Sequence, residues 1–394
     1  MSFRVALISL HTSPLSQPGS GDAGGMNVYL VGLAEALAEA GTEVELITRD
    51  AGEGTADAHT PGGVPVRFVK AGPRAPVPKG ELAALTPDFA RSLAELPRFD
   101  VVHSHYWLSG LAGLEAAAAW RAPHILSLHT VAALKNQRLA SGDRPEPAER
   151  LAGERMLVRA SARTVTATEA ERRAVLDAAG PGLGADRVVV VPPGVDPVLF
   201  HPREAVAPDP YLLVLARIQP LKGIELAIEA VAALPADRRP RLVVAGGTSP
   251  GHDDYAAVLR ALAERSGARV EFLPAQSRSA TAALLAGAEL LIVPSHSETF
   301  GLVALEAAAS GTPVVAAASG GLVEAVADGV SGVLLTDRDP ERWAEAIDRL
   351  LTDPRRLAAL GASAAEHAAR HTWAGTAEQL RRVYRGAVEE PLRE

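Results

Sequence analysis

Short Val-, Ile- and Leu-rich runs alternate with Ala-rich helical segments along most of this chain, and the alternation occurs twice. The first series of runs is FRVALISL, EVELITRD, VPVRFVKA, DVVHSHY, HILSLHT, RTVTATE and RVVVVPP. The second series is YLLVLARI, RLVVAGG, VEFLPA, ELLIVPS, PVVAAAS and GVLLTD. Apolar strands separated by helices are typical of a parallel sheet covered on both faces. We therefore predict an α/β protein with two Rossmann-like, doubly wound parallel-sheet domains.

The segment PPGVDPVLFHPREAVAPDP separates the two series, because its closely spaced prolines interrupt both the strand and the helix pattern. A chain of 394 residues also exceeds the size of one hydrophobic core. We place a first domain at residues 1–198 and a second at 199–372, and we expect an amphipathic helix within 373–394 to cross back onto the first domain. The carboxyl ends of both sets of strands then face one cleft, where open parallel sheets bind ligands.

Composition and charge exclude several classes of function. The chain has no cysteine, which removes disulfides, thiolate metal sites and thiol nucleophiles. The net charge of −8 comes without a basic block, so we expect a small-molecule ligand and no nucleic-acid partner. No apolar run approaches the roughly 20 residues that a membrane helix needs. The start, MSFRVALISL, lacks a basic leader, so we expect a first strand rather than a signal peptide, no membrane association and a cytoplasmic location.

A glycine-rich stretch, PGSGDAGGMN, follows the first predicted strand. Gly19, Gly21 and Gly24 have the GxGxxG spacing of a dinucleotide site, but HTSPLSQP separates them from the strand, whereas that fingerprint needs them in the strand-to-helix turn itself. A long loop that leads into a helix near Gly24 and Gly25, whose free amides favour an anion, fits better. A flexible loop with helix-packing glycines remains the alternative.

The segment SHSETFGLVALEAAASGTPVV carries the clearest functional signal. Glu298 lies on the loop after a predicted strand, Gly301 opens the next helix, and Glu306 falls about one turn inside that helix. A loop carboxylate can accept hydrogen bonds from sugar hydroxyls, amides at Gly301 and Leu302 can face a pyrophosphate, and the second carboxylate can reach ribose hydroxyls. The alternative is that Glu298 and Glu306 are unrelated carboxylates that face solvent. That alternative does not explain why the glycine and GTPVV occur with them.

Arg217 and Lys222 follow the first strand of the second domain, in LARIQPLKG. Two cations at the carboxyl end of a strand can neutralise the charge that develops on a departing diphosphate, without a metal ion. Only four of the 39 basic residues are lysines, so a retained lysine can mark a place that needs a compact ammonium group. Chance survival of a few solvated lysines is the alternative.

Histidines lie near the ends of two predicted strands. His103 and His105 share one face of a strand, but no carboxylate or cysteine accompanies them as in a zinc site, so we expect core or cleft hydrogen bonds and no metal. His129 ends the strand HILSLHT, next to Thr130. Its place at a carboxyl end makes His129 the better candidate for contacting a reacting sugar.

Together these residues resemble the retaining glycosyltransferases of family four, which have the two-domain GT-B fold, and the resemblance covers nearly the whole chain. Within that family, HTSPLSQPGSGDAGGMNVY is similar to the members of mycothiol biosynthesis that transfer GlcNAc from UDP-GlcNAc to 1D-myo-inositol 3-phosphate. The resemblance implies that this chain catalyses the same hexosyl transfer, or transfer to a similar phosphorylated acceptor. It also implies that the donor is a UDP-sugar and that the reaction requires no cofactor.

The resemblance also implies roles for single positions of this sequence. Donor contacts are implied at His11, Gln17, Pro18, Gly25, Arg217, Lys222, Glu298 and Glu306, and the motif that contains these two glutamates adds Gly301 and Leu302. Acceptor contacts are implied at Asp22, Ala23, Gly24, Gly25, Met26, Asn27, Lys79, Tyr106, Thr130 and Arg150, several of them suited to a phosphate. Catalysis is assigned to Arg217, Lys222, His129 and Glu298. Three of the four lysines thus fall in or near matched motifs, which strengthens the argument from lysine scarcity.

The chain departs from the family pattern in two places. Gln276 stands where the pattern has arginine, and Leu285 where it usually has tyrosine, which weakens the case for uracil recognition and for a bound Mg²⁺ nearby. The acceptor is less firmly indicated than the reaction, because sucrose-phosphate synthases have a similar first loop and also bind a sugar phosphate. A monomer and a homodimer both remain open.

The expected chemistry is transfer with retention at the anomeric carbon, by front-face attack through an ion-pair-like transition state. Arg217, Lys222 and the helix end at Gly301 would stabilise the leaving diphosphate, whose oxygen takes the proton of the acceptor, and His129 would hold the sugar. The alternatives are a UDP-glucose-dependent enzyme like sucrose-phosphate synthase, a non-catalytic nucleotide-sugar-binding protein, a dehydrogenase and a nucleotide-sugar epimerase.

Overall fold

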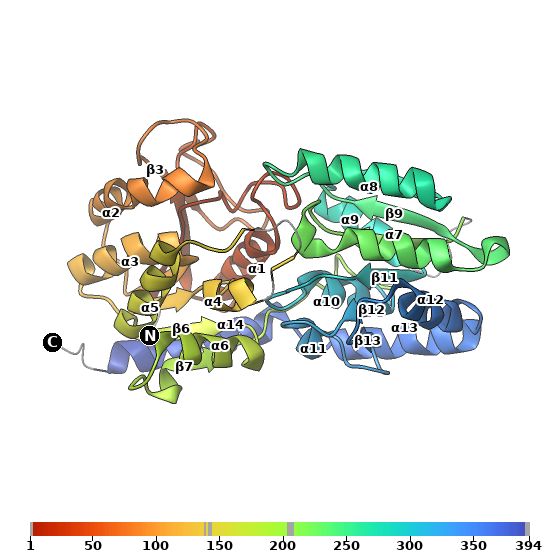
Figure 1. Cartoon of the computed structure of the whole chain (residues 1–394). Helices are drawn as coiled ribbons and strands as arrows, with labels where there is room; N and C mark the ends of the chain where they lie inside the picture. The colour runs from red at the N-terminus through yellow and green to blue at the C-terminus, as the bar shows by residue number, and fades with distance from the viewer. Residues whose placement is uncertain (1–2, 138, 141–143, 203–208, 391–394) are drawn as a thin grey trace.

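Two lobes lie side by side in the structure, a computed structural model, and each is a sheet covered by helices (Figure 1). The structure describes residues 3–137, 139–140, 144–202 and 209–390. Residues 391–394, the end of the predicted segment 373–394, lie outside the described residues. Two sheets of parallel strands confirm the predicted fold class.

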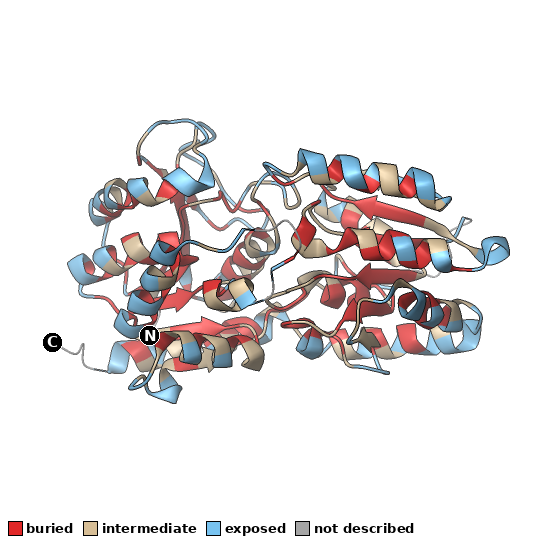
Figure 2. Ribbon diagram, in the orientation of Figure 1, coloured by how far each residue is buried: buried red, intermediate tan, exposed pale blue. Residues whose placement is uncertain are grey.

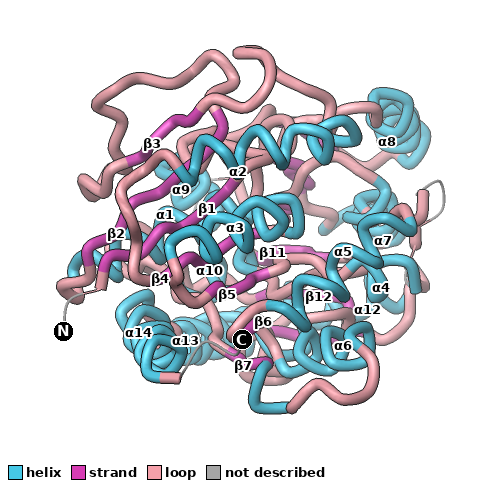
Figure 3. Tube along the Cα trace, turned by 90° about the vertical axis from the view of Figure 1, so that its left-hand side faces the viewer, coloured by secondary structure: helices cyan, strands magenta, loops and turns pink. Residues whose placement is uncertain are grey.

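The first sheet has seven parallel strands among the described residues, in the order β3-β2-β1-β4-β5-β6-β7, which Figure 3 shows in succession. They are β1 (Arg4–Ser9), β2 (Glu43–Arg49), β3 (Val66–Val69), β4 (Val101–His105), β5 (His124–Ser127), β6 (Arg163–Thr166) and β7 (Val188–Val190). Strand β1 pairs with β2 on one side and with β4 on the other. The strand order therefore reverses at β1, and a ligand crevice is expected beyond its carboxyl end.

Helices cover both faces of this sheet. They are α1 (Gly25–Glu39), α2 (Thr86–Ala94), α3 (Trp107–Trp120), α4 (Ala132–Gln137), α5 (Ala148–Ala160) and α6 (Glu169–Ala179), with the short 3₁₀ helices η1 (Lys79–Leu85) and η2 (Ala185–Arg187). Helix α1 begins at Gly25, as the sequence predicts, and points its first turn at the junction of the lobes (Figure 1).

Within the described ranges, the second sheet has six parallel strands in the order β10-β9-β8-β11-β12-β13. They are β8 (Tyr211–Leu215), β9 (Arg241–Ala245), β10 (Val270–Leu273), β11 (Leu290–Val293), β12 (Val314–Ala317) and β13 (Gly332–Leu335). The helices around it are α7 (Ile224–Ala233), α8 (Asp253–Ser266), α9 (Arg278–Gly287), α10 (Leu302–Ala309), α11 (Leu322–Ala325), α12 (Pro340–Leu351) and α13 (Pro354–Ala368), with η3 (Pro220–Lys222) and η4 (Ala236–Arg238). No helix in the described ranges is long and apolar enough to cross a membrane.

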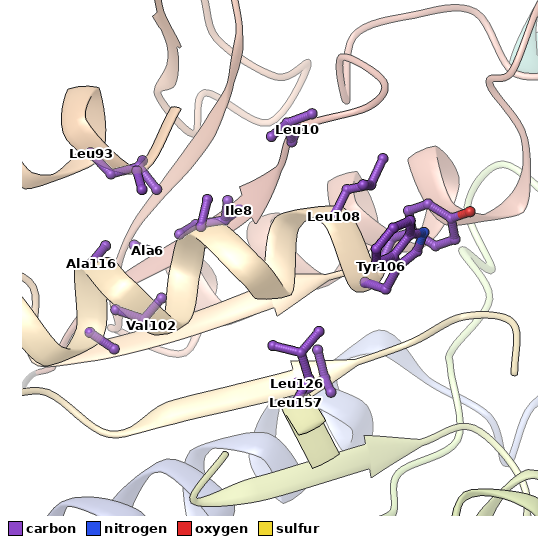
Figure 4. Packing of buried hydrophobic residues seen from close by; sticks show 14 of the residues in the cluster. Ala6, Ile8, Leu10, Leu93, Val102, Tyr106, Leu108, Ala116, Leu126 and Leu157 are labelled. Atoms are coloured by element: carbon purple, nitrogen blue, oxygen red, sulfur yellow. The ribbon is translucent and has the colours of Figure 1, made fainter. Parts of the chain in front are cut away.

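Alternate residues of each strand pack on opposite faces, so each sheet separates two cores. In β1, Ala6 and Ile8 belong to the core under α2 and α3, whereas Val5 and Leu7 belong to the core under α1. Figure 4 shows the first of these cores, where Ile8 and Val102 of the sheet lie in one cluster with Leu93 of α2 and with Leu108 and Ala116 of α3. Figure 2 shows the central strands buried, as expected for sheets with helices on both faces, whereas the edge strands β3 and β10 are partly exposed.

The C-terminal helix α14 (Trp373–Glu389) leaves the second lobe and packs beside α1 of the first (Figure 1). The Trp373 ring lies against Gly32 of α1, where a side chain would clash with the indole. Leu380 and Tyr384 complete the core that contains Val5 and Leu7. The hydroxyl of Tyr384 lies 2.7 Å from His103 Nδ1, at the centre of the sheet.

Tyr384→Phe is expected to lower the free energy of unfolding by about 1–3 kcal/mol, because it leaves the buried Nδ1 of His103 without its hydrogen bond while keeping the ring packing. The measurement is the melting temperature with circular dichroism as a check on the fold. A melting temperature equal to that of the wild type would contradict the assigned hydrogen bond.

Candidate functional site

Two adjoining cavities lie between the lobes, at the carboxyl ends of both sets of strands. The first has a volume of about 220 Å³ and the second of about 190 Å³. They share Gly24 and Gly25 at the start of α1, Arg217 after β8, and Glu298 and Gly301 after β11. The point where the strand order reverses in each sheet thus faces the same cleft, as expected for ligand binding in this fold class.

Most of the predicted site residues line these cavities. The first cavity is lined by His11, Asp22, Gly24, Gly25, Met26, Lys79, Tyr106, His129, Thr130, Arg217, Glu298, Gly301 and Leu302. The second adds Pro18, Lys222 and Glu306. The sequence therefore located the cleft, whereas the individual donor, acceptor and catalytic roles stay predictions.

Four predicted site residues do not line either cavity, and the structure gives them other partners. Gln17 Nε2 donates to the Ala275 carbonyl oxygen across the cleft at 3.0 Å, and Ala23 is buried. Asn27 is buried and donates to Thr12 Oγ1 and to the Ser13 carbonyl oxygen, while its Oδ1 accepts from the Gly24 amide at 2.9 Å. The fourth, Arg150, is engaged behind Thr130 and is described below. Gln17 and Asn27 thus shape the glycine-rich loop.

Glu298 and Lys222 form an ion pair inside the cleft. Lys222 Nζ lies 2.5 Å from Glu298 Oε1, and both side chains are largely buried. Ser295 Oγ donates to the same carboxylate oxygen at 2.9 Å. The pair places one compact cation and one hydroxyl-binding carboxylate side by side where the two cavities meet.

The tip of helix α10 projects into both cavities. Gly301, the residue before the helix, has φ +96°, and a Cβ there would lie 2.7 Å from Leu322 Cδ2. Glycine is therefore required at this turn. The first amides of α10 have no partner within the helix, so this end offers donors to an anion in the cleft.

The loop before α1 reaches across the cleft to the second lobe. The Gly247 amide donates to the Gly19 carbonyl oxygen at 3.0 Å, and Arg217 Nη1 donates to the Gly21 carbonyl oxygen at 3.3 Å. Arg217 Nη1 also lies 3.9 Å from Asp22 Oδ1. Because Arg217 faces both cavities, one guanidinium can contact groups held by either lobe.

His129 occupies a strained position at the end of β5. Its φ is +59°, and Tyr106 at the end of β4 has φ +77°, so two of the three described non-glycine residues with positive φ line the first cavity. Such backbone conformations cost on the order of 1–3 kcal/mol and cluster at functional sites. The hydroxyl of Thr299, from the second lobe, donates to the His129 carbonyl oxygen.

The imidazole of His129 is neutral and tied to a second histidine. Burial lowers the pKa of His129 to about 3, and its Nε2 lies 2.8 Å from His105 Nδ1. His103 contacts Ser127 Oγ at 2.9 Å besides Tyr384. The expectation that His103 and His105 make core hydrogen bonds is thus confirmed. A neutral imidazole at His129 suits a hydrogen bond to a ligand better than proton transfer at neutral pH.

A cluster of cations surrounds the ring of Tyr106. The Arg150 guanidinium lies 4.8 Å and the Lys79 ammonium 5.1 Å from the ring centroid. Arg150 is fixed by Glu146 at 2.9 Å and Glu154 at 2.7 Å, and its Nη2 donates to Thr130 Oγ1 at 2.7 Å. In the described part of the chain no ion pair engages Lys79, so its charge is available to an anionic ligand.

The sequence reasoning missed several residues that line the cavities. They are Tyr29, Ser127, Glu171, Pro193, Thr299, Phe300 and Arg278. Glu171 is buried, its Oε2 accepts from the Ala167 amide at 2.7 Å, and burial raises its pKa to about 7. A signal was present, because Thr168 and Glu171 have the spacing of a helix-capping box, which brings a carboxylate to the first turn.

Glu171→Gln is expected to remove a pH dependence of stability. The folded pKa of Glu171 lies above its ordinary value of 4.5, so the folded state holds a proton that the unfolded state releases between pH 4.5 and 7. The contribution of Glu171 to the free energy of unfolding is therefore largest below that pH window. It falls by about 3 kcal/mol as the pH rises through the window. Melting temperatures from pH 5 to 8 measure it. The two melting temperatures should be similar at pH 5, where Glu171 is protonated, and the variant should become the more stable of the two as the pH rises, while Glu169→Gln, a partly exposed neighbour on α6, controls for loss of charge. A constant difference would contradict the prediction.

No group of three or more His, Cys, Asp or Glu side chains is placed to hold a metal ion within the described ranges. The positive charge of the cleft comes instead from Arg217, Lys222 and Lys79, together with the helix end at Gly301. These groups favour anions, and their spread over two lobes favours a ligand, or a pair of ligands, with more than one anionic group.

Two family models match the chain, one for each lobe. Residues 24–194 match a glycosyl transferase 4-like domain, and residues 199–367 match glycosyl transferases group 1. The chain is 46% identical to the D-inositol 3-phosphate glycosyltransferase of Stackebrandtia nassauensis, over 98% of this chain and 92% of that protein. This chain belongs to the group 1 glycosyltransferases.

Other relatives and solved structures agree with this assignment. The D-inositol 3-phosphate glycosyltransferase of Mycobacterium marinum is 44% identical to this glycosyltransferase, over 98% of this chain and 86% of that protein. The structure of sucrose-phosphate synthase from Thermosynechococcus elongatus is similar with a TM-score of 0.87 and 30% identity, over 98% of both chains. HepE from Anabaena, in complex with UDP and glucose, has a TM-score of 0.78 at 22% identity, covering 98% and 100% of the chains, and shows the shared fold. The GT-B assignment made from the sequence is thus confirmed.

Proposed function

We propose that this glycosyltransferase moves N-acetylglucosamine from UDP-GlcNAc to 1D-myo-inositol 3-phosphate, with retention of configuration at the anomeric carbon. One observation carries the proposal: a single cleft joins an anion site on the second lobe, made by Lys222, Arg217 and the tip of α10, to a separate cationic cluster on the first lobe around Tyr106. Two anion sites fit a diphosphate donor and a phosphorylated acceptor. Similarity to D-inositol 3-phosphate glycosyltransferases over 98% of the chain supports the choice of substrates.

The donor would lie along the second lobe. In this proposal the diphosphate faces the amides of Gly301 and Leu302 and the cations Arg217 and Lys222, and the hexose lies against Glu298 and His129. The ribose lies at Glu306, in the second cavity. Solved structures of HepE with UDP and with UDP-glucose support a nucleotide diphosphate as the ligand of this fold.

The acceptor would lie on the first lobe. Its phosphate is bound by the free ammonium of Lys79 and by Thr130, whose hydroxyl is held by Arg150. A charge-assisted hydrogen bond of this kind contributes about 1.5–3 kcal/mol, which is enough to select phosphorylated from unphosphorylated acceptors. Met26 and Tyr106 would cover the apolar faces of the acceptor ring.

The proposed reaction breaks the bond between the anomeric carbon and the β-phosphate oxygen and forms a bond to the acceptor hydroxyl oxygen on the same face. The proton of that hydroxyl passes to the departing phosphate oxygen, so no side chain has to act as a base, in keeping with the lowered pKa of His129. Arg217 and Lys222 stabilise the negative charge that develops on the diphosphate. No cofactor is required, since these two cations supply the charge that a metal ion would otherwise bring, and a bound Mg²⁺ is not part of the proposal.

A second candidate function is glucosyl transfer from UDP-glucose to a sugar phosphate. The observation in its favour is the 30% identity and TM-score of 0.87 to sucrose-phosphate synthase. Both functions use the same cationic cluster for an acceptor phosphate, so they differ in the acceptor ring and in the 2-substituent of the hexose.

The test is a panel of donors and acceptors with the purified chain. UDP-GlcNAc and UDP-glucose are each mixed with 1D-myo-inositol 3-phosphate, fructose 6-phosphate and unphosphorylated inositol, and the products are identified by mass spectrometry. The proposal expects UDP release and a GlcNAc-inositol phosphate product only with the first donor and first acceptor, with the α configuration of the donor kept in the product by NMR. Transfer to fructose 6-phosphate would favour the second candidate function. UDP binding without turnover would indicate a non-catalytic binding protein.

A further inference from the structure

Glu306 shares the far end of the second cavity with a cation that no motif of the sequence indicated. Arg278, the first residue of α9, lies with its Nη1 2.8 Å from Glu306 Oε1. The side chain of Glu306 is only 7% exposed, and that of Arg278 is 34% exposed. Both residues line the cavity, so the pair forms one end of the proposed nucleotide site.

The guanidinium of Arg278 is fixed from two sides. It lies 4.7 Å from the centroid of the Phe200 ring, and Phe200 is fully buried in the segment between the lobes. The planar group is thus held between an aromatic face and the carboxylate, which restricts how far it can swing toward a ligand. Its ion pair with Glu306 is made to Oε1 of the carboxylate.

Arg278 is also the only charged side chain in the described part of the chain that offsets the burial of Glu306. Burial raises the pKa of Glu306 above its ordinary value, and the charge of Arg278 and its hydrogen bond oppose that rise without cancelling it. Among the described residues, no charged group on α9, α11, α13, β11 or β12, the elements that contact α10, shifts the pKa of Glu306 beside Arg278. A buried carboxylate without a cation would tend to take up a proton.

We propose that Arg278 is a positioning residue for nucleotide recognition: it keeps Glu306 ionised and aimed so that the carboxylate accepts hydrogen bonds from the 2′- and 3′-hydroxyls of the donor ribose. The inference rests on the proposed function and adds to it the residue that sets the preference for a ribonucleotide over a 2′-deoxyribonucleotide. Arg278 acts through Glu306 and does not itself contact the ligand.

The test compares the Kd of UDP with that of 2′-deoxy-UDP by calorimetry, from pH 6 to 8.5. Both ligands carry the same diphosphate, so its own titration cancels in the ratio of the two constants. The wild type should prefer UDP by about tenfold or more at every pH, as expected for a hydrogen bond to a charged group. In Arg278→Met the preference should fall to about twofold at pH 6 and recover as the pH rises, since Glu306 then ionises only at higher pH.

Two further variants separate positioning from a general loss of structure. Glu306→Gln should lose the preference at all pH values, and adding Arg278→Met to it should change the ratio no further, because Arg278 acts through that carboxylate. Arg278→Lys keeps a cation and should keep the ratio independent of pH. Arg260→Met is the matched control, because Arg260 also lies over a phenyl ring, that of Phe272, at 5.2 Å, but does not line the cavity.

The outcomes distinguish this inference from the proposed function. A wild type that prefers UDP, with an unchanged ratio in Arg278→Met at pH 6, would overturn the role of Arg278 and leave the proposed function standing. Failure of the wild type to bind UDP would overturn the proposed function and the inference with it. If Arg278→Met is unfolded by circular dichroism, the pH profile of Arg278→Lys decides, and a profile that falls at low pH would contradict the positioning role.

Discussion

Lys222→Ala is expected to lower kcat by about two to three orders of magnitude while the Kd of UDP changes much less. The ammonium group lies at the meeting point of the two cavities, where the proposed diphosphate leaves, and it stabilises charge that grows only as the bond breaks. Lys222 is largely buried, so water does not replace the lost cation efficiently. The measurement is kcat and KM with both substrates, with the UDP affinity determined separately by calorimetry.

Lys222→Ala also removes the ion-pair partner of Glu298, so its effect on kcat is not that of the ammonium group alone. Lys222→Arg therefore accompanies it: a guanidinium keeps the charge but not the compact shape, and kcat should lie between those of the wild type and the alanine variant. Lys70→Ala, at an exposed lysine outside the cleft, is the matched control. An unchanged kcat in Lys222→Ala would remove Lys222 from the catalytic assignment.

Lys79→Met is expected to raise KM for the phosphorylated acceptor by about 10- to 100-fold, with a small effect on kcat and on the KM of the donor. The ammonium lies over the Tyr106 ring and has no carboxylate partner in the described residues, so its removal deletes a charge-assisted hydrogen bond to the proposed phosphate without leaving an unpaired acid. Steady-state kinetics with the acceptor varied at saturating donor measures the effect.

Arg150 is the less informative position for the same question. It is paired with Glu146 and Glu154, so Arg150→Met would leave the buried Glu154 without a cation, although Glu146 keeps Lys135, and would destabilise the fold. For Lys79→Met, the control is Lys70→Met, which removes a lysine outside the cleft. A KM for the acceptor that stays at the wild-type value in Lys79→Met would place the acceptor phosphate away from the Tyr106 cluster.

The fold could be predicted from the sequence because local and global signals agree. Each predicted strand run contains a strand of the structure, and α1 and α14 begin at the predicted Gly25 and Trp373. The signal is strong because both sheets are buried on both faces, so their strands are continuous apolar runs. The order of the strands, such as β1 between β2 and β4, depends on packing across the sheet. No single strand segment of the sequence predicts it.

The site was predictable only where a residue type is unusual for its place. Gly301 and Lys222 stand out in the sequence, because a left-handed turn needs glycine and lysine is rare in this chain. Arg278 does not stand out among so many arginines, and its importance arises from a carboxylate 28 positions away in the chain that the fold places 2.8 Å from it. Likewise the partner of His129 is His105, from the neighbouring strand, which only the pairing of β4 with β5 brings near.

The last helix has a consequence for how this protein is made. Leu30, Leu33 and Leu37 of α1 face a core that is closed by Ala377, Leu380 and Tyr384. Domains usually fold in turn as the chain leaves the ribosome, N-terminal first. Here the first lobe stays open along α1 until α14 has emerged, so its completion waits until the second lobe has been synthesised. A chain that stops before Trp373 would contain every residue of the first sheet and still lack a finished first lobe.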